Sequence, residues 1–301
     1  MKLLSVGDLN LDIIFYVERL PGEGGEALTE KMEYSPGGSA ANLAVAFRRL
    51  GGESWFFGAV GRDFIGAWLR SRLKEEGVRS DLVALREDKS TGTMCIISTP
   101  RDRTIVGHRG ANEALPPPNV LEPLSFDAVF ISGYSFLGEN MAVAAAIAEM
   151  FAAKNVPVYV DVSGVFAEKG WKVLSGLRHK LRALLMNEAE ARVFFGGEPF
   201  LPGFVDEVVV KLGKHGARAY SSKGAVEAEG FSVPVVDTTG AGDVFDAAYI
   251  WASLRGMGLR ERLVFANAVA AIKVSRRGGW SAPTLEEVAF FLKQRGVEIP
   301  L

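Results

Sequence analysis

The chain has 301 residues, of which 48% are hydrophobic and 23% are charged, so it can bury a large core as one α/β domain with an appendage. A formal net charge of -2 argues against general affinity for nucleic acid or anionic membranes, and any phosphate site must therefore be local. The single cysteine, Cys95, excludes an intramolecular disulfide, and the three histidines are too far apart in sequence to suggest a metal cluster.

The N-terminal sequence enters a strand pattern at once, with neither the apolar core nor the small-residue cleavage site of a signal peptide. The apolar stretch 141–151 is too short to span a bilayer. We therefore expect a cytoplasmic protein without a membrane partner.

Short β-branched runs alternate along the chain with longer helical patterns. The strands that we expect lie at 3–6, 54–57, 128–132, 156–160, 183–186 and 208–212. The helices that we expect lie at 40–50, 64–76, 140–154, 188–194, 244–254 and 261–275. Alternation of this kind is typical of βαβ units, which form a parallel sheet covered by helices.

Two segments, 11–34 and 90–112, interrupt this alternation. They contain strand-like stretches at 12–17 and 93–98 with no helix inside either segment, and 99–103 is typical of a hairpin turn. We expect antiparallel strands that form a small separate sheet, beside a core made of 1–10, 35–89 and 113–301. An ordinary extension of the sheet edge or a dimer contact is the alternative.

The segment Asp237-Thr-Thr-Gly-Ala-Gly-Asp243 lies between an apolar run and a helical pattern. Its glycines allow a tight turn, so the amides of residues 240–243 can point together at an anion from the start of a helix. Asp243 places a carboxylate beside that anion site. A plain helix cap is the alternative, because the helix dipole favours an acidic residue there. A carboxylate kept only for capping would weaken the anion site, and the segment therefore predicts phosphoryl transfer.

This segment resembles the second signature of the ribokinase-like sugar kinases, the PfkB family, and 37–52 resembles the first signature. The resemblance continues at 58–66, 187–190 and 211–216 and covers essentially the whole chain. It implies a three-layer α/β/α fold with a mainly parallel central sheet, and a small β lid over the sugar. It also implies that Asp243 is the catalytic base and that an anion hole is formed by the amides of Gly240, Ala241 and Gly242.

The resemblance extends to the acceptor side, where it implies binding by Asn10, Asp12, Gly37, Gly38, Asn42, Arg103, Arg109 and Asn112. A buried carboxylate such as Asp12 is costly unless it is hydrogen-bonded, and sugar hydroxyls are suitable partners. An arginine in the lid would suit an acceptor that carries phosphate or carboxylate, whereas a solvated arginine is the alternative. Relatives that bind ribose often carry a lysine where this chain has Ser39, so the identity of the sugar stays open.

On the donor side the resemblance implies nucleotide binding by Asn187, Lys211, Gly213, Gly216, Thr238 and Asn267. Asn187 and Glu190 would hold Mg²⁺ through water, because this ion keeps several of its waters in protein sites. The same pair is also a plain capping pattern for a helix. Asp237 and Thr239 would enclose a monovalent cation, with K⁺ as the candidate.

Taken together, the resemblance implies a Mg²⁺-dependent kinase that transfers the terminal phosphoryl group of a nucleotide, ATP by default, to a hydroxyl of a small sugar-like acceptor. The alternatives within this class are a nucleoside, inositol or sugar-phosphate kinase, with ADP as another donor. A non-catalytic sugar- or nucleotide-binding regulator is the alternative outside it, against which the presence of Asp243 argues. We also expect a homodimer through the lid, and a helix dipole that keeps Asp243 ionised and only weakly basic.

Overall fold

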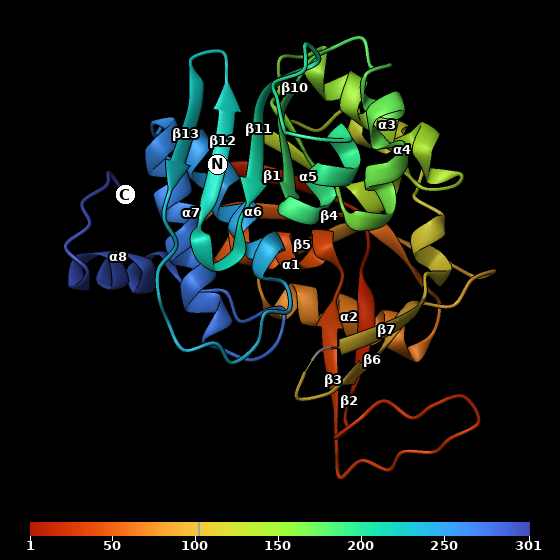
Figure 1. The fold of residues 1–301 in the computed structure, drawn as a ribbon. Helices are drawn as coiled ribbons and strands as arrows, with labels where there is room; N and C mark the ends of the chain where they lie inside the picture. The colour runs from red at the N-terminus through yellow and green to blue at the C-terminus, as the bar shows by residue number, and fades with distance from the viewer. Residues whose placement is uncertain (102) are drawn as a thin grey trace.

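The computed structural model describes residues 1–101 and 103–301. Within these ranges a central sheet has nine strands in the order β13-β12-β11-β10-β9-β8-β1-β4-β5 (Figure 1). Its strands are β1 (Lys2–Val6), β4 (Glu53–Gly61), β5 (Arg79–Arg86), β8 (Ala128–Ser132), β9 (Val158–Asp161), β10 (Leu181–Asn187), β11 (Val205–Lys211), β12 (Ala217–Ser221) and β13 (Gly224–Ala228). All pairs from β5 to β11 are parallel, while β12 and β13 pair antiparallel. The expectation of a mainly parallel sheet is confirmed.

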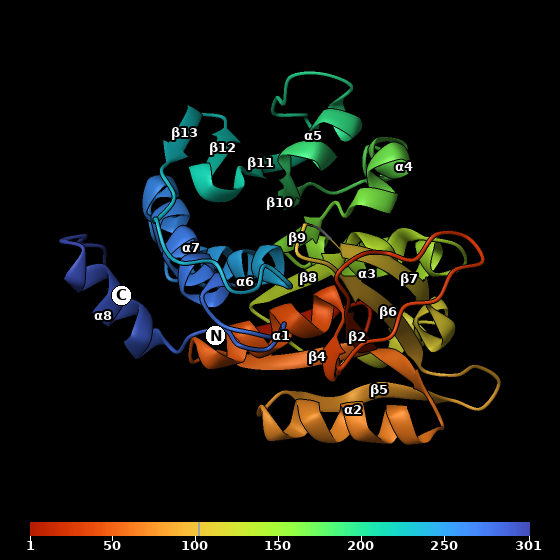
Figure 2. The same cartoon turned by 60° about the horizontal axis from the view of Figure 1, so that its bottom comes forward.

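Helices cover both faces of this sheet and complete three layers (Figure 2). On one face pack α1 (Ser39–Arg49), α2 (Phe64–Glu75), α6 (Ala241–Leu254), α7 (Leu259–Val274) and α8 (Leu285–Gln294). On the other face pack α3 (Asn140–Ala152), α4 (Gly164–Leu174) and α5 (Glu188–Phe195). Short 3₁₀ turns are η1 (Gly110–Glu113), η2 (Pro118–Leu121), η3 (Gly133–Phe136) and η4 (Gly213–His215). Among the helices of the described ranges, none has the length and apolar composition needed to cross a membrane.

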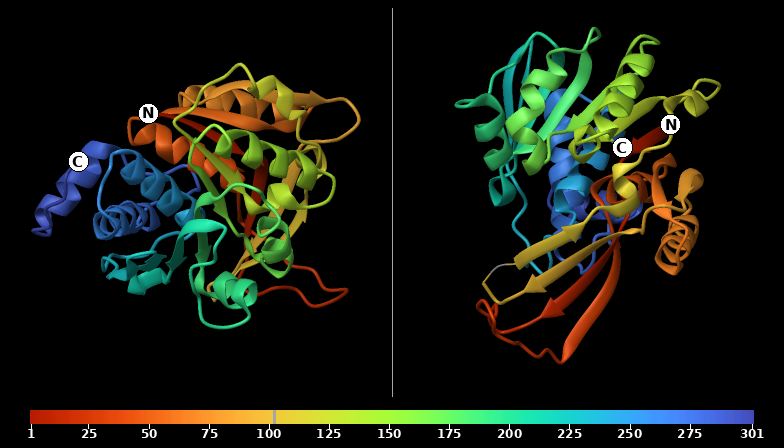
Figure 3. Two further views of the ribbon diagram at one scale, coloured as in Figure 1. Left: turned by 90° about the horizontal axis from the view of Figure 1, so that it is seen from above. Right: turned by 90° about the vertical axis from the view of Figure 1, so that its right-hand side faces the viewer.

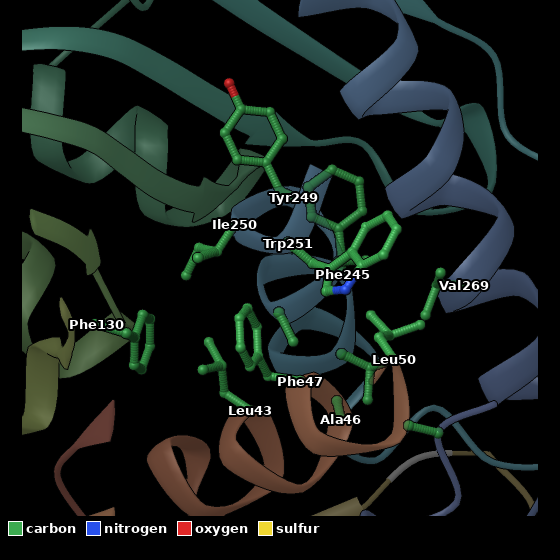
Figure 4. Close-up of a cluster of buried hydrophobic side chains, with 14 of the residues drawn as sticks. Leu43, Ala46, Phe47, Leu50, Phe130, Phe245, Tyr249, Ile250, Trp251 and Val269 are labelled. Atoms are coloured by element: carbon green, nitrogen blue, oxygen red, sulfur yellow. The ribbon is translucent and has the colours of Figure 1, made fainter. Parts of the chain in front are cut away.

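Burial alternates along the strands, because successive side chains of a strand point to opposite faces. In β1, Leu3 belongs to the core on the α1 side, whereas Leu4 and Val6 belong to the core on the α3 side. Figure 4 shows the α1-side core, where Phe47 of α1 and Ile250 of α6 lie in the same group of buried side chains. This core joins the beginnings of α1 and α6, the two segments that carry the family signatures, and it fixes them against each other.

A second sheet has four strands within the described ranges, in the order β3-β2-β6-β7. They are β2 (Asn10–Tyr16), β3 (Lys31–Gly37), β6 (Gly92–Ser98) and β7 (Arg103–His108), and Figure 3 shows them projecting from the core. We call this sheet the lid. Ser98 pairs with Arg103, as the predicted hairpin at 99–103 requires, although Asp102 in its turn lies outside the described residues.

One expectation about the lid is wrong. Its strands are not all antiparallel, because β2 and β6 pair parallel from Asn10↔Gly92 to Tyr16↔Ser98. Both strands run in the same direction from the core. The β2–β3 hairpin and the β6–β7 hairpin are therefore joined through their first strands. The strand bounds otherwise follow the proposed lid segments 11–34 and 90–112, with β2 beginning one residue earlier and β3 running on to Gly37.

Candidate active site

Asp243 lies in the first turn of α6, close to the first turn of α1. Its Oδ1 accepts a hydrogen bond from Ser39 Oγ at 2.7 Å, and its Oδ2 accepts one from Asn42 Nδ2 at 2.7 Å. Burial raises the pKa of Asp243 above its ordinary value, and these two hydrogen bonds only partly oppose the effect. The expectation of an especially weak base is therefore wrong, because burial exceeds the stabilising effects on the carboxylate.

The turn before α6 determines which amides can meet an anion. Gly240 is the N-cap residue in the left-handed region, with φ 72°, where a side chain is rarely tolerated. The N–H of Ala241 already donates to Thr238 O at 3.1 Å. The next first-turn amides, those of Gly242 and Asp243, have no acceptor within their own helix. An anion at this helix start would therefore meet these two amides more readily than that of Ala241.

A cavity of about 220 Å³ lies between the lid and the core, and we call it the lid cavity. It is lined by Asp8, Asn10, Asp12, Gly38, Ser39, Met94, Ile96, Arg103, Ile105, Arg109, Tyr134 and Thr239. Five of the residues predicted to bind the acceptor are among these. The other three do not line it. Gly37 lies against Asp12, Asn42 donates to Asp243, and Asn112 donates to Asn10.

The Asp12 carboxylate is the most exceptional group of the lid cavity. Asp12 is 8% exposed, yet its carboxylate accepts no hydrogen bond from any residue that the structure describes. Burial, and then the Asp243 carboxylate, raise the pKa of Asp12 to about 7, while Arg103 acts in the opposite direction. A Cβ atom on Gly37 would lie 2.2 Å from Asp12 Oδ2, so glycine at 37 leaves room for this carboxylate.

Arg109 is engaged by the protein itself. Its Nη2 donates to Asp8 Oδ1 at 3.0 Å and to the carbonyl of Tyr134 at 3.0 Å. Burial raises the pKa of Asp8 although Arg109 beside it favours the ionised form. The predicted role of Arg109 as an anion clamp is thus opposed by this ion pair. Sequence reasoning missed Asp8, which could have been noted because it lies two residues before Asn10, the first residue of β2.

Asn112 is a buried residue that fixes the side chain of Asn10 by a hydrogen bond. It is 1% exposed, its Oδ1 accepts from Leu9 N at 3.0 Å, and its Nδ2 donates to Asn10 Oδ1. Its polar atoms are therefore used inside the protein and do not face the lid cavity.

Gly38 is required by the backbone, because it has φ 101° and a Cβ atom there would lie 2.2 Å from Asp8 O.

Arg103 connects the lid with the turn before α6. Its Nη1 donates to Thr239 Oγ1 at 2.9 Å, across 136 residues of sequence. A guanidinium from the lid is therefore held beside the segment that leads to the Asp243 helix.

A second cavity, of about 780 Å³, lies beside α6 and α7, and we call it the α6–α7 cavity. Five residues predicted to bind the nucleotide line it: Lys211, Gly213, Gly216, Thr238 and Asn267. Its other walls are largely apolar and include Phe231, Val233, Val235, Phe245, Ala270 and Val274. The first turn of α6, with Ala241 and Gly242, closes one end. A flat apolar group with an anionic tail would match this combination.

Lys211 is buried at the end of β11 between two carboxylates that sequence reasoning missed. Its Nζ donates to Asp161 Oδ2 at 2.9 Å and to Asp246 Oδ2 at 2.9 Å. Burial alone would lower the pKa of Lys211, but Asp161 and Asp246 raise it instead. The lysine is therefore a fixed positive charge, and a Cβ atom on Gly242 would lie 3.4 Å from its Nζ.

Asn187 and Glu190 form the capping box of α5. The N–H of Glu190 donates to Asn187 Oδ1 at 2.9 Å, and that of Asn187 donates to Glu190 Oε2 at 2.8 Å. Burial and then Asp161 raise the pKa of Glu190, whereas Lys211 lowers it. Glu190 is thus close to the Lys211 cluster, but Asn187 does not line the α6–α7 cavity. Within the described residues, no three metal-ligating side chains converge.

Asp237, the first residue of the second signature, is fully engaged by neighbouring groups. Its Oδ1 accepts from Thr239 N at 2.8 Å, and its Oδ2 accepts from Gly278 N at 2.8 Å. Burial would raise the pKa of Asp237, but these amide bonds lower it below its ordinary value. Its main-chain carbonyl accepts from Lys273 Nζ at 2.9 Å. Lys273 was not among the predicted site residues.

Comparison with known proteins agrees with this arrangement. Residues 1–285 match the family model described as pfkB family carbohydrate kinase. An "ATP-dependent ribose-1-phosphate kinase" of Halopiger xanaduensis is 32% identical, over 98% of this chain and 99% of that protein. A ribokinase of Bacillus subtilis is 28% identical, over 95% of this chain and 98% of its own. The solved structure of Arabidopsis thaliana ribokinase with ribose and ATP has a TM-score of 0.81 and 26% identity, with 97% and 98% of the two chains covered.

The family model covers nearly all of the chain, the ribose-1-phosphate kinase is similar along almost its whole length, and the two-sheet architecture agrees with the solved ribokinase. The chain therefore belongs to the pfkB family of carbohydrate kinases and is a phosphotransferase with an alcohol group as acceptor.

Proposed function

We propose that this enzyme transfers the terminal phosphoryl group of ATP, with Mg²⁺, to a hydroxyl of a pentose held in the lid cavity. The position of Asp243 carries this proposal. Its hydrogen-bond partner Ser39 lines the lid cavity, and the residues before it, Ala241 and Gly242, line the α6–α7 cavity. A base between an acceptor site and a donor site is the arrangement that direct phosphoryl transfer requires.

The acceptor proposal rests on the chemistry of the lid cavity. Asp12 lacks a hydrogen-bond partner in the described protein, and vicinal hydroxyls of a sugar would satisfy it. Asn10 adds a side chain held in place by Asn112. The cavity, at about 220 Å³, suits a single small ring better than a nucleoside.

The donor proposal rests on the α6–α7 cavity and on relatives. The cavity combines apolar walls for a base with glycine turns and the α6 N-terminus for phosphates. The relative from Halopiger xanaduensis is named as ATP-dependent, and a protein of the same fold from E. coli, a putative ribokinase II, was solved with ATP and Mg²⁺ at 24% identity. We therefore favour ATP over ADP.

Mg²⁺ would fit near Glu190, acting through water. One carboxylate oxygen of Glu190 caps α5, and the other remains for a water of the ion. When bound, Mg²⁺ neutralises charge on the donor phosphates. Lys211 also lines the α6–α7 cavity, with its ammonium held between the carboxylates of Asp161 and Asp246.

The chemistry then depends on the residues of this chain. Asp243 accepts the proton of the attacking hydroxyl, and a bond forms between that oxygen and the terminal phosphorus as the bond to the leaving ADP breaks. The amides of Gly242 and Asp243 stabilise the transferring group. Burial supports this role, since the raised pKa of Asp243 makes it a better proton acceptor when ionised.

A phosphorylated pentose is the second candidate acceptor. Arg103 lines the lid cavity, and a guanidinium suits a phosphate. The relative with 32% identity is named a ribose-1-phosphate kinase. In this alternative the sugar phosphate takes the same cavity, with its phosphate towards Arg103.

A screen of the purified protein with Mg²⁺ tests these proposals. ATP and ADP are crossed with ribose, ribose-1-phosphate, other sugar phosphates, nucleosides, inositols and sugar acids, and products are followed by ³¹P NMR. We expect turnover of a pentose or its phosphate with ATP, and loss of turnover in Asp243→Asn. Ligand binding without turnover across the panel would instead support a non-catalytic regulator.

We further propose that two lids pair in a homodimer. Both edge strands of the lid expose apolar side chains, with Tyr34 60% exposed on β3 and Val106 66% exposed on β7. Tyr34→Lys together with Val106→Lys should convert a dimer to a monomer in sedimentation. A monomeric wild-type protein would contradict this proposal.

A further inference from the structure

Lys273 is a buried cation at the end of α7 that the proposed mechanism does not use. None of its side chain is exposed, although lysine is among the residues least often found buried. Its Nζ donates to the main-chain carbonyl of Asp237 at 2.9 Å, across 36 residues of sequence. Burying an ammonium group costs several kcal/mol unless other groups compensate, so its presence here requires a reason.

The surroundings of Lys273 connect it to the turn before α6. The amides of Val236 and Asp237 both donate to Val274 O, at 2.7 Å and 3.1 Å. Together with the Lys273 bond and the Gly278 amide on Asp237 Oδ2, they fix the start of the second signature to the end of α7. The turn that follows supplies the amides proposed for the transferring phosphoryl group. Lys273 therefore fixes the residue from which that turn begins.

The charge of Lys273 also interacts with the carboxylate of Asp243. Burial, with a contribution from Arg103, lowers the pKa of Lys273 below its ordinary value, whereas the carboxylates of Asp237 and Asp243 act in the opposite direction and favour the ammonium form. Asp243 is therefore within electrostatic range of Nζ. A positive charge behind the anion hole would stabilise negative charge that gathers there in the transition state.

The residues expected to enclose K⁺ do not fit a second cation at this place. K⁺ binds where carbonyl oxygens replace its water shell, and the carbonyl of Asp237 already faces the Lys273 ammonium. Both carboxylate oxygens of Asp237 accept amide N–H groups, and the Thr239 hydroxyl accepts from Arg103. An ion on the same carbonyl would be repelled by the ammonium at close range.

We propose that the ammonium group of Lys273 takes the place of a bound monovalent cation, so that this kinase works without K⁺. Lysine is suited to this role, because its ammonium is a compact point charge with three donors. Lys273 is then a positioning residue that orders the turn before α6 and contributes a positive charge beside it. The inference rests on the proposed phosphoryl transfer, and its tests therefore include measurements that need no turnover.

The first test compares monovalent salts on the wild-type enzyme. Initial rates are measured at matched ionic strength in choline chloride, NaCl and KCl with saturating ATP, Mg²⁺ and acceptor. We expect kcat in KCl to stay within about twofold of that in choline chloride, because the site has its own cation. A wild-type enzyme that is inactive until K⁺ is added would overturn the proposal.

The second test removes the charge with Lys273→Met, which keeps most of the side-chain volume. In choline chloride we expect kcat to fall by about tenfold or more, with the KM for the acceptor within about twofold of wild type. KCl or NH₄Cl should restore much of kcat, while NaCl should restore less because the ion is smaller. Lys293→Met, at an exposed lysine of α8, serves as the matched control and should show neither the loss nor the rescue.

The third test needs no turnover. Melting temperatures of wild type, Lys273→Met and Lys293→Met are measured in choline chloride with KCl added at constant ionic strength. Only Lys273→Met should gain stability specifically from K⁺, because only this variant opens a cation site. A K⁺-specific gain in wild type, or none in Lys273→Met, would overturn the proposal even if no acceptor is found.

If Lys273→Met does not fold, the wild-type melting curves still decide the question, since a K⁺ site in the native protein would raise its melting temperature. Absence of turnover on every acceptor, with the expected melting behaviour, would contradict the kinase proposal alone. The two failures are therefore distinguishable.

Discussion

The two cavities on either side of Asp243 are built in different ways. The α6–α7 cavity is formed by glycine turns and apolar side chains from one part of the chain, residues 211–274. The lid cavity is lined mostly by polar and charged residues that converge from the lid strands β2, β6 and β7, from the start of α1, from η3 and from the turn before α6. This difference suggests a common donor site assembled from backbone, and an acceptor site whose selectivity depends on individual side chains. The predictions below test whether the two halves are separable.

The largest effect should come from Asp243, which belongs to neither half alone. We expect Asp243→Asn to reduce kcat by about 10² to 10⁴, because the hydroxyl loses its proton acceptor. The amide keeps the shape and still contacts Ser39 and Asn42, so ATP affinity measured by calorimetry should change little. If ATP binding were lost together with kcat, Asp243 would belong to the donor site and the comparison would fail.

The next effect should be confined to the acceptor half. We expect Asp12→Asn to raise the KM for the acceptor by about 10- to 100-fold while the KM for ATP stays the same, because an unpartnered buried carboxylate is replaced. In wild type, acceptor affinity should rise as the pH passes upward through about 7, where Asp12 becomes ionised. An acceptor KM that does not change with pH would contradict this assignment.

The raised pKa of Asp12 also predicts how the stability of the protein depends on pH. The folded-state pKa of Asp12, about 7, lies above its ordinary value of 3.8, so between these values the folded protein holds a proton that the unfolded chain releases. Its contribution to the free energy of unfolding therefore falls as the pH rises through this window. Asp12→Asn should melt higher than wild type at pH 8, with a smaller difference at pH 5. Asp81→Asn, at an exposed and ion-paired carboxylate, should show no such gain.

The donor half was largely predictable from sequence, because glycine turns are local signals. Gly213, Gly216 and Thr238 could be assigned from short motifs, and all three line the α6–α7 cavity. The amides proposed for the anion hole depend on more than the local sequence. Whether the amide of Ala241 is free depends on a bond to Thr238 that only the folded turn reveals.

The charged partners were missed, because each depends on a contact distant in sequence. Lys211 meets Asp161 across 50 residues and Asp246 across 35. Spacing gave no sign of these pairs, although Asp246 lies three residues after Asp243 and Asp161 ends a buried strand. The same reason explains why Arg109 was predicted as a clamp when Asp8, 101 residues away, neutralises it.

Several peripheral elements were also missed, for reasons of pattern. The edge strand β5 is half exposed, and α4 is interrupted by glycines at 164 and 170. Helix α8 begins at a Thr284 and Glu287 capping box, which is a sequence signal of a helix start. Inner strands such as β8 were located correctly, because they are buried on both faces.

A smaller effect on the acceptor KM should come from Arg103, the lid arginine that lines the lid cavity. We expect Arg103→Met to raise the KM for a phosphorylated pentose by about tenfold, because the guanidinium that would meet its phosphate is removed. The KM for unphosphorylated ribose should change less, and ATP binding should not change. Arg101→Met, on the same hairpin but not lining the lid cavity, is the matched control. Equal losses for both acceptors would mean that Arg103 positions neighbouring groups such as Thr239 and does not bind the phosphate.

The smallest effect concerns Asn187, where capping and a magnesium role make different predictions. Asn187→Ala and Thr284→Ala each remove a side chain that caps a helix within a capping box, so each should lower the free energy of unfolding by about 1 kcal/mol. Thr284 is the N-cap residue of α8, lies outside both cavities and forms the same kind of capping box as Asn187.

If Asn187 also orders water around Mg²⁺ beside Glu190, only Asn187→Ala should raise the Mg²⁺ concentration needed for half-maximal rate, by up to about tenfold. Unfolding in urea measures the first effect and Mg²⁺ titration at fixed ATP measures the second. An unchanged Mg²⁺ requirement in both variants would show that Asn187 acts only as a helix cap.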